Sequence, residues 1–294
     1  MNIEKLKVML APLERYSDSC FRLLCEKLGA DLTFIPMISV NSINNENFVR
    51  KIIKESKISK AIQLFGRDLN LFIKSINLFS KYFKVININL GCPSFKIIKQ
   101  GYGAALLRDL KSIRNILKEI RKNYTGILSV KTRIGFDKIN IYEQMKIYEK
   151  YTDFVIIHGR TAKQGFRGKN NWKLIKEVAL KSKIPVIGNG DIFTYEDYVK
   201  YKSYAHGICI GRGALINPLI FKEIKTSKRI SDVKQKVNVM LEYVNCAEKN
   251  IPFSVIKLHF YQFFKGFKKS KYYRTRLNSC NKVEDIRKLI YELI

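Results

Sequence analysis

Short runs of apolar and β-branched residues alternate along the chain with longer segments in which apolar residues recur every three or four positions. The short runs predict strands that are buried on both faces and are therefore apolar throughout. The longer segments predict amphipathic helices that bury one face. Eight strands are expected, at residues 7–12, 32–38, 61–66, 85–92, 128–135, 154–161, 185–192 and 207–215.

Helical segments follow these strands in turn. They are expected at residues 18–28, 46–56, 69–82, 110–123, 141–151, 171–181, 194–203 and 218–225. Asp18, Asn45 and Thr194 suit the N-cap position, where a side-chain oxygen accepts a backbone N–H of the first turn. Eight strand–helix units in succession predict an α/β protein with a (β/α)8 TIM barrel. An open doubly wound sheet is the alternative, but it usually has fewer units and a GxGxxG loop after strand one, which is absent here.

The strand pattern ends near residue 225. Three helices are expected beyond it, at residues 232–248, 254–267 and 283–293, with a basic linker at 265–271. The aromatic run at 260–264 is interpreted as helix packing. We therefore expect a barrel domain at residues 1–225 and a small helical domain at 226–294.

The charge of the chain indicates the kind of partner. The 294 residues include 55 Lys and Arg against 25 Asp and Glu, a net charge of +30. Such a surplus favours a polyanion, and nucleic acid is the first candidate. The basic residues are spread over many elements, and no stretch approaches the ~20 apolar residues that span a bilayer. No membrane association is expected.

The six cysteines show neither a CxxC pair nor a zinc-like Cys/His spacing. They stand at positions 20, 25, 92, 209, 246 and 280. In a chain of this length the pattern predicts reduced thiols, without a disulfide framework or a metal site. Residues 1–16 hold too short an apolar run for a signal peptide, so a cytoplasmic protein is expected.

Cys92 lies in a position that suits a catalytic residue. It follows the apolar strand that contains Val85, Ile86 and Ile88, and it precedes a loop rich in Lys and Gly. A thiol at the end of a buried strand, covered by a flexible basic loop, is well placed to meet a substrate. A structural cysteine before a turn is the alternative.

Six strand ends in succession carry polar or glycine clusters, and the chemistry of a barrel occurs at the carboxyl ends of its strands. The clusters contain Gln63; Asn89 and Cys92; Lys131 and Arg133; His158, Arg160 and Thr161; residues 188–191; and residues 211–213. The glycines of the last two clusters indicate a phosphate site, because backbone without a Cβ can approach an anion closely. Tight turns are the alternative explanation.

Lys131 and His158 are expected on adjacent strands of this barrel. Positive or hydrogen-bond-donating groups in such a place would stabilise the anionic reduced form of a flavin. The Gln63 amide has both a donor and an acceptor, which suits the edge of a pyrimidine-like ring.

Seven stretches of the chain resemble, in the same order, the tRNA-dihydrouridine synthases. They are APLERYSDSCFR (11–22), QLFGRD (63–68), INLGCPSFKIIKQGYGAALLRD (88–109), VKTRIG (130–135), HGRT (158–161), PVIGNGDI (185–192) and GICIGRGALINPLIF (207–221). The stretch LHFYQFFKGF (258–267), followed by Arg274 and Arg276, is similar to the helical tRNA-binding domain of that family. The chain has Leu13, Arg15, Tyr16 and Asn87 where the family usually has Met, Gly, Val and Asp, and Leu219 replaces a common Trp.

The resemblance implies an enzyme that uses FMN to reduce the C5–C6 double bond of uridine in tRNA, with NADPH or NADH as electron donor. We expect hydride to pass from flavin N5 to C6 while the Cys92 thiol, protonated near its reference pKa of about 8.5, protonates C5. The residues expected to hold the cofactor are Ala11, Pro12, Leu13, Gln63, Lys131, His158, Asn189, Gly190, Asp191, Gly211 and Arg212.

Seven residues are expected to contact the tRNA. They are Asn89 at the uracil edge, Lys96 and Lys99 in a mobile loop that clamps phosphates, Arg133, Arg160, Arg274 and Arg276. The alternatives are a buried Asn89 that satisfies backbone groups, and solvated lysines at 96 and 99. The expected enzyme is a monomer and needs no metal.

Two alternatives remain open. Another FMN barrel enzyme that acts on a small molecule, such as a dihydroorotate or dihydropyrimidine dehydrogenase, would share the fold and cofactor but gives no reason for the net charge of +30. A non-catalytic RNA-binding barrel without a cofactor would purify colourless, whereas an FMN protein is yellow.

Overall fold

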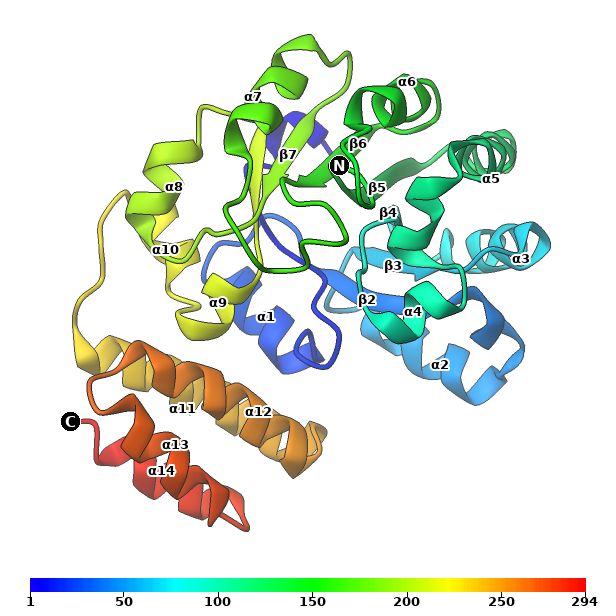
Figure 1. Ribbon diagram of the computed structural model, residues 1–294. Helices are drawn as coiled ribbons and strands as arrows, with labels where there is room; N and C mark the ends of the chain where they lie inside the picture. The colour runs from blue at the N-terminus through cyan, green and yellow to red at the C-terminus, as the bar shows by residue number, and fades with distance from the viewer.

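The computed structural model describes all 294 residues and contains one sheet of eight parallel strands (Figure 1). The strands are β1 (Val8–Leu10), β2 (Phe34–Ser39), β3 (Ala61–Phe65), β4 (Val85–Asn89), β5 (Ile127–Arg133), β6 (Phe154–His158), β7 (Val186–Asn189) and β8 (Gly207–Ile210). They are hydrogen-bonded in the order β1-β8-β7-β6-β5-β4-β3-β2, and a parallel bridge between Met9 and Leu32 joins β1 to the segment before β2. The predicted TIM-barrel fold is confirmed.

Helices follow the strands, and most of them cover the outer face of the sheet (Figure 1). They are α1 (Ser19–Lys27), α2 (Glu46–Glu55), α3 (Leu69–Phe79), α4 (Phe95–Lys99), α5 (Leu110–Asn123), α6 (Ile141–Tyr151), α7 (Trp172–Lys181), α8 (Tyr195–Tyr201), α9 (Arg212–Ile216) and α10 (Ile220–Thr226). The three expected N-caps, Asp18, Asn45 and Thr194, accept backbone N–H groups of α1, α2 and α8. The last strand is shorter than predicted, because α9 begins at Arg212 within the expected range 207–215.

The core has two layers, separated by the strands. A small cluster inside the barrel contains Met9, Phe34, Val85 and Ile156, whereas a larger one packs the outer strand faces against the helices. Alternate residues of a strand face opposite sides. In β4, Val85 therefore faces inward and Ile86 outward.

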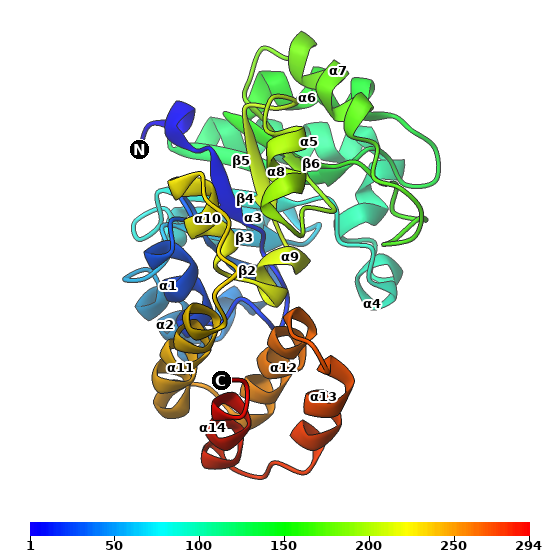
Figure 2. The ribbon, with the colours of Figure 1, turned by 90° about the vertical axis from the view of Figure 1, so that its left-hand side faces the viewer.

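Four helices, not the predicted three, follow the barrel: α11 (Val233–Asn250), α12 (Phe253–Phe263), α13 (Ser270–Asn278) and α14 (Val283–Tyr291). The prediction failed at α13, which lies partly in the expected linker. Only Tyr273 and Leu277 of α13 are buried, so its apolar period is too weak to recognise. Figure 2 shows the four helices packed together below α1 and α9.

The four C-terminal helices, α11 to α14, contact the barrel through α1. Cys20 of α1 and Cys246 of α11 form a disulfide, so the prediction that all cysteines are reduced was wrong. The two residues are 226 positions apart in sequence, and only the packing of α1 on α11 brings them together. Nearby, the Asp18 carboxylate lies 2.7 Å from Nε2 of the buried His259 and accepts a hydrogen bond from the Tyr243 hydroxyl. No helix is both long enough and apolar enough to cross a bilayer.

Candidate active site

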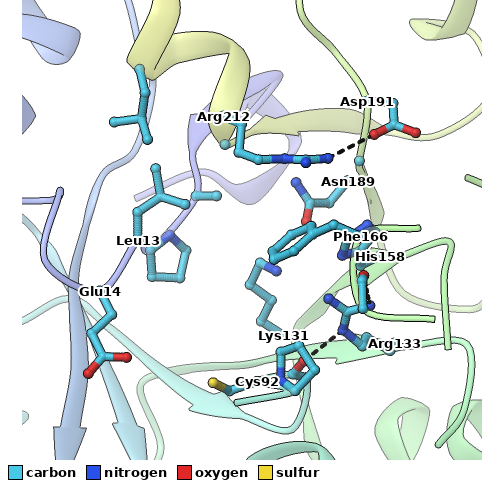
Figure 3. Close-up of a pocket in the computed structure, with 18 of the residues that line it drawn as sticks. Leu13, Glu14, Cys92, Lys131, Arg133, His158, Phe166, Asn189, Asp191 and Arg212 are labelled. Carbon is cyan, nitrogen blue, oxygen red and sulfur yellow. Dashed lines mark hydrogen bonds and ion pairs between the residues drawn. The ribbon is translucent and has the colours of Figure 1, made fainter. Parts of the chain in front are cut away.

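A cavity of about 880 Å³ lies at the carboxyl ends of the strands (Figure 3). All the residues expected to hold a cofactor line it, and so do Cys92, Asn89 and Arg133. They reach the cavity because inward positions become polar toward the end of each strand. In β4 the inward series runs Val85, Asn87, Asn89, and Lys131 lies beside Asn89 in the neighbouring β5.

Lys131 extends from β5 toward the centre of the cavity (Figure 3). Its ammonium forms no hydrogen bond or ion pair with the protein, although 13 ion pairs form elsewhere in the chain. Burial, with a smaller contribution from the charge of the neighbouring Arg133, lowers the pKa of Lys131 to about 8. A partly dehydrated cation without a partner favours the binding of an anionic group in the cavity.

Cys92 follows β4 and is half-buried, with its sulfur on the side of the cavity that faces Glu14 (Figure 3). Burial raises the pKa of the Cys92 thiol, and the negative charge of Glu14 adds to this effect. The Ser94 N–H and the charges of Lys131 and Arg133 act in the opposite direction without reversing it. The thiol therefore holds its proton at neutral pH, which suits an acid and not a nucleophile.

A chain of side-chain hydrogen bonds inside the barrel holds the Cys92 backbone. Asn87 donates to the Ser129 hydroxyl at 2.8 Å and accepts from the Gln63 amide at 2.7 Å. The Gln63 carbonyl in turn accepts from the Asn89 amide at 3.0 Å. The Asn89 oxygen accepts the backbone N–H groups of Gly91 and Cys92 at 3.0 and 2.9 Å. One N–H of Asn89 and one of Gln63 remain for a ligand.

Arg133 supports the same turn from the other side. Its Nε donates to the Gly91 carbonyl at 2.8 Å, and its Nη1 donates to the carbonyls of Thr161 and Gly165. The buried guanidinium thus joins the loop after β4 to the loop after β6. Its two Nη2–H groups have no protein partner. Because Arg133 lines the cavity, they remain available to a ligand.

The segments after β7 and β8 carry glycines that line the site. Gly190 has a φ of 118° and Asp191 a φ of 53°, both in the left-handed region. Asp191 is held between Arg160 at 2.5 Å and Arg212 at 3.1 Å. A Cβ added at Gly211 would meet no atom closer than 3.6 Å, so backbone there stands clear of other groups. These features fit an anion cradle.

His158 lies beside these cations. Burial lowers the pKa of His158 well below its ordinary value, and the charges of Arg133 and Lys131 lower it further. The imidazole is therefore neutral at pH 7. Its Nε2 lies 3.5 Å from Nη1 of Arg160, which can only donate, so Nδ1 carries the proton and is the donor.

Five of the residues expected to contact tRNA lie outside the cavity lining. Arg160 is buried and donates to Asp191 and to the Arg167 and Gly168 carbonyls, so its donors are used within the protein. Lys96 and Lys99 are exposed on the helix α4, where a loop had been predicted. Arg274 and Arg276 lie on α13, stacked on Tyr261 and Tyr272.

Several lining residues escaped the sequence analysis. Glu14 lies four residues after the end of β1, in the same segment as Ala11, Pro12 and Leu13, so its position could have identified it. Phe166 belongs to the loop after β6, and its ring lies 4.4 Å from the Arg212 guanidinium carbon. Gln262 and Lys265 come from the tail, and no local signal places them at a barrel mouth. No cluster of three or more His, Cys, Asp or Glu side chains could hold a metal ion.

The fold and its polar mouth define a TIM-barrel enzyme. The family model described as Dihydrouridine synthase (Dus) matches residues 9–292, and the chain belongs to this family of oxidoreductases. A probable tRNA-dihydrouridine synthase of Aquifex aeolicus is 31% identical, over 99% of this chain and 97% of its own. The tRNA-dihydrouridine synthase B of Pasteurella multocida is 32% identical, over 82% and 77%.

Solved structures with similar folds are more distant in sequence. A 2-naphthoyl-CoA reductase complex aligns with a TM-score of 0.57 and 12% identity, over 76% of this chain and 50% of its own. Morphinone reductase aligns with a TM-score of 0.51 and 9% identity, over 77% and 87%. At such low identity these similarities show the fold alone.

Proposed function

We propose that the protein is an FMN-dependent tRNA-dihydrouridine synthase, which reduces the C5–C6 double bond of uridine in tRNA with electrons from NADPH or NADH. The observation that carries this proposal is a protonated thiol, Cys92, in the same cavity as Lys131, a cation without a protein partner. Membership of the family and the names of the relatives from Aquifex and Pasteurella support it.

The residues of the cavity fit FMN. A volume of about 880 Å³ is within the usual range for a cofactor site. The open backbone at Gly211, with Arg212, would hold the phosphate, while Lys131 and His158 would lie beside the flavin ring. Ala11, Pro12 and Leu13 would line one side of it, with Gln63, Asn189 and Asp191 completing the site. Reduced FMN supplies a hydride for C6 of the uracil ring when bound there.

Cys92 supplies the matching proton. Because burial raises its pKa, the thiol is protonated across the neutral range and can deliver a proton to C5 without further activation. Asn89 and Arg133 fix the Gly91–Cys92 peptide, because Asn89 accepts its N–H and Arg133 donates to its carbonyl oxygen. Their free N–H groups would bind the uracil edge. Lys131 stabilises negative charge that develops in the site.

Uridine must leave its stack to reach this cavity, at a cost of a few kcal/mol. Phosphate contacts from the basic surface would offset that cost and make binding sensitive to salt. Lys96 and Lys99 on α4 and Arg274 and Arg276 on α13 are proposed to supply some of them. In this proposal residues 1–225 form the catalytic barrel and residues 226–294 the tRNA-binding domain of a cytoplasmic monomer.

Flavin spectroscopy with competing substrates tests the proposal. The purified protein should be yellow, release about one FMN per chain on denaturation, and bleach when NADPH is added without oxygen. Unmodified tRNA should then reoxidise the flavin, whereas orotate or free uracil should not. Reoxidation by a free pyrimidine but not by tRNA would support a small-molecule enzyme, and a colourless protein that cannot be reconstituted would contradict the cofactor assignment.

A further inference from the structure

Phe95 is the most exposed large apolar side chain of the protein. It is 81% exposed and belongs to neither hydrophobic cluster. The cause is local: α4 buries Ile97, and a residue two positions away on a helix points roughly 200° round the axis. An aromatic ring in water is costly, so this one is a candidate contact surface.

The position of Phe95 ties it to the active site. It directly follows Ser94, and Cys92, Pro93 and Ser94 all line the cavity, whereas Phe95 itself does not. In Figure 2, α4 projects from the body of the barrel. Phe95 is therefore the first residue beyond the cavity lining on this segment, at the start of a helix that projects from the barrel.

The surroundings of Phe95 are basic. Lys96 and Lys99 are exposed on the same short helix. No acidic residue occurs between Asp68 and Asp109, so no carboxylate in this stretch of the chain offsets the two lysines. An aromatic ring among cations matches a single-stranded nucleic acid, whose bases stack on the ring while its phosphates meet the lysines.

We propose that Phe95 stacks on the nucleotide next to the extruded uridine. When the uridine enters the cavity, its neighbour loses a stacking partner and its base face is exposed. The Phe95 ring covers that face, and Lys96 or Lys99 binds an adjacent phosphate. This inference rests on the proposed action on tRNA and names a residue that positions the RNA.

A salt titration of tRNA affinity separates stacking from charge. Phe95→Ala should weaken binding by about 5- to 150-fold and leave the slope of log affinity against log salt unchanged. Lys96→Ala should reduce that slope by about one phosphate contact. Phe95→Trp should bind about as well as the wild type, because it preserves the aromatic face.

Tyr82→Ala is the matched control. Tyr82 is 44% exposed and precedes β4, so it lies at the opposite end of the same strand and should have no effect on tRNA binding. Reduction of the bound flavin by NADPH should proceed at the wild-type rate in Phe95→Ala, which shows that the variant is folded and its cavity intact.

An abasic tRNA makes the test specific. Two tRNAs are used, one without the base on the 5′ side of the target uridine and one without the base on its 3′ side. With one of these two tRNAs, wild type and Phe95→Ala should have the same affinity. The inference is overturned if both proteins bind tRNA equally, or if the difference persists with both abasic tRNAs. It is also overturned if Phe95→Ala changes only self-association without RNA. A wild-type protein that neither binds nor modifies tRNA would overturn the proposed function first, and this inference with it.

Discussion

Replacement of Lys131 by methionine should stabilise the flavin-free protein while it destroys the cofactor site. Burial lowers the pKa of Lys131 from 10.5 to about 8. This difference corresponds to about 3 kcal/mol by which the charged lysine destabilises the folded state at neutral pH. Methionine has a similar length and no charge, so Lys131→Met should raise the free energy of unfolding by about that amount at pH 7.

The pH dependence of this effect has a definite sign. Between about pH 8 and 10.5 the unfolded chain still binds the Lys131 proton and the folded protein does not, so wild-type stability rises relative to the variant as pH increases. The gap between the two proteins should therefore be full at pH 7 and close toward pH 10.5. FMN affinity should change in the opposite direction and fall by about tenfold or more, because the cation proposed to lie beside the flavin is gone.

Denaturant unfolding of the flavin-free proteins at pH 7 and pH 10 measures the stability difference between wild type and Lys131→Met and its dependence on pH. Fluorescence titration measures FMN affinity. Lys163→Met is the control, because Lys163 lies at the rim of the same cavity but is exposed. Lys163→Met removes a positive charge that is already hydrated in the folded protein, so the free energy of unfolding should change little. If Lys131→Met were less stable than the wild type at pH 7, or if the gap did not depend on pH, the account of Lys131 as an unpaired buried cation would be refuted.

Three further variants test other parts of the structure. Cys92→Ser should bind FMN and accept electrons from NADPH normally, while dihydrouridine formation measured by mass spectrometry falls by about 100-fold or more; near-normal turnover would contradict the acid role. Although burial opposes ionisation of Asp18, its hydrogen bond and charge interaction with His259 lower its pKa overall. Asp18→Asn should thus cost about 1–3 kcal/mol in unfolding experiments above pH 4, with the difference disappearing as pH falls through the lowered pKa. Cys20→Ser should lower the unfolding free energy by about 2–5 kcal/mol without reductant and abolish the effect of reductant; equal stability with and without reductant in the wild type would argue against the disulfide to Cys246.

The barrel and the lining of its mouth were accessible from sequence because both depend on local patterns. Each apolar run is a strand, and alternation within the run decides which side chains face inward. Asn89, Lys131 and His158 occupy inward positions near the ends of neighbouring strands, so their meeting at one mouth follows from the parallel order of the sheet.

The features that escaped prediction depend on contacts between distant segments. The Cys20–Cys246 disulfide needs α1 and α11 to pack together, and no spacing in the sequence encodes that. Gln262 and Lys265 reach the cavity only through the docking of the tail. For Asn89 the sequence left two roles open, and the structure bears out the backbone role, because its oxygen accepts the Gly91 and Cys92 N–H groups. The role at the uracil edge stays a prediction.

Direct detection of the product tests the central claim. A tRNA transcript without modified bases is incubated with the purified protein, FMN and NADPH, digested, and mapped by mass spectrometry. The account predicts a gain of two hydrogens at one or a few uridines with the wild type, and little or none with Cys92→Ser. A yellow protein that NADPH bleaches, but that leaves every uridine of the transcript and of native tRNA unchanged, would contradict it.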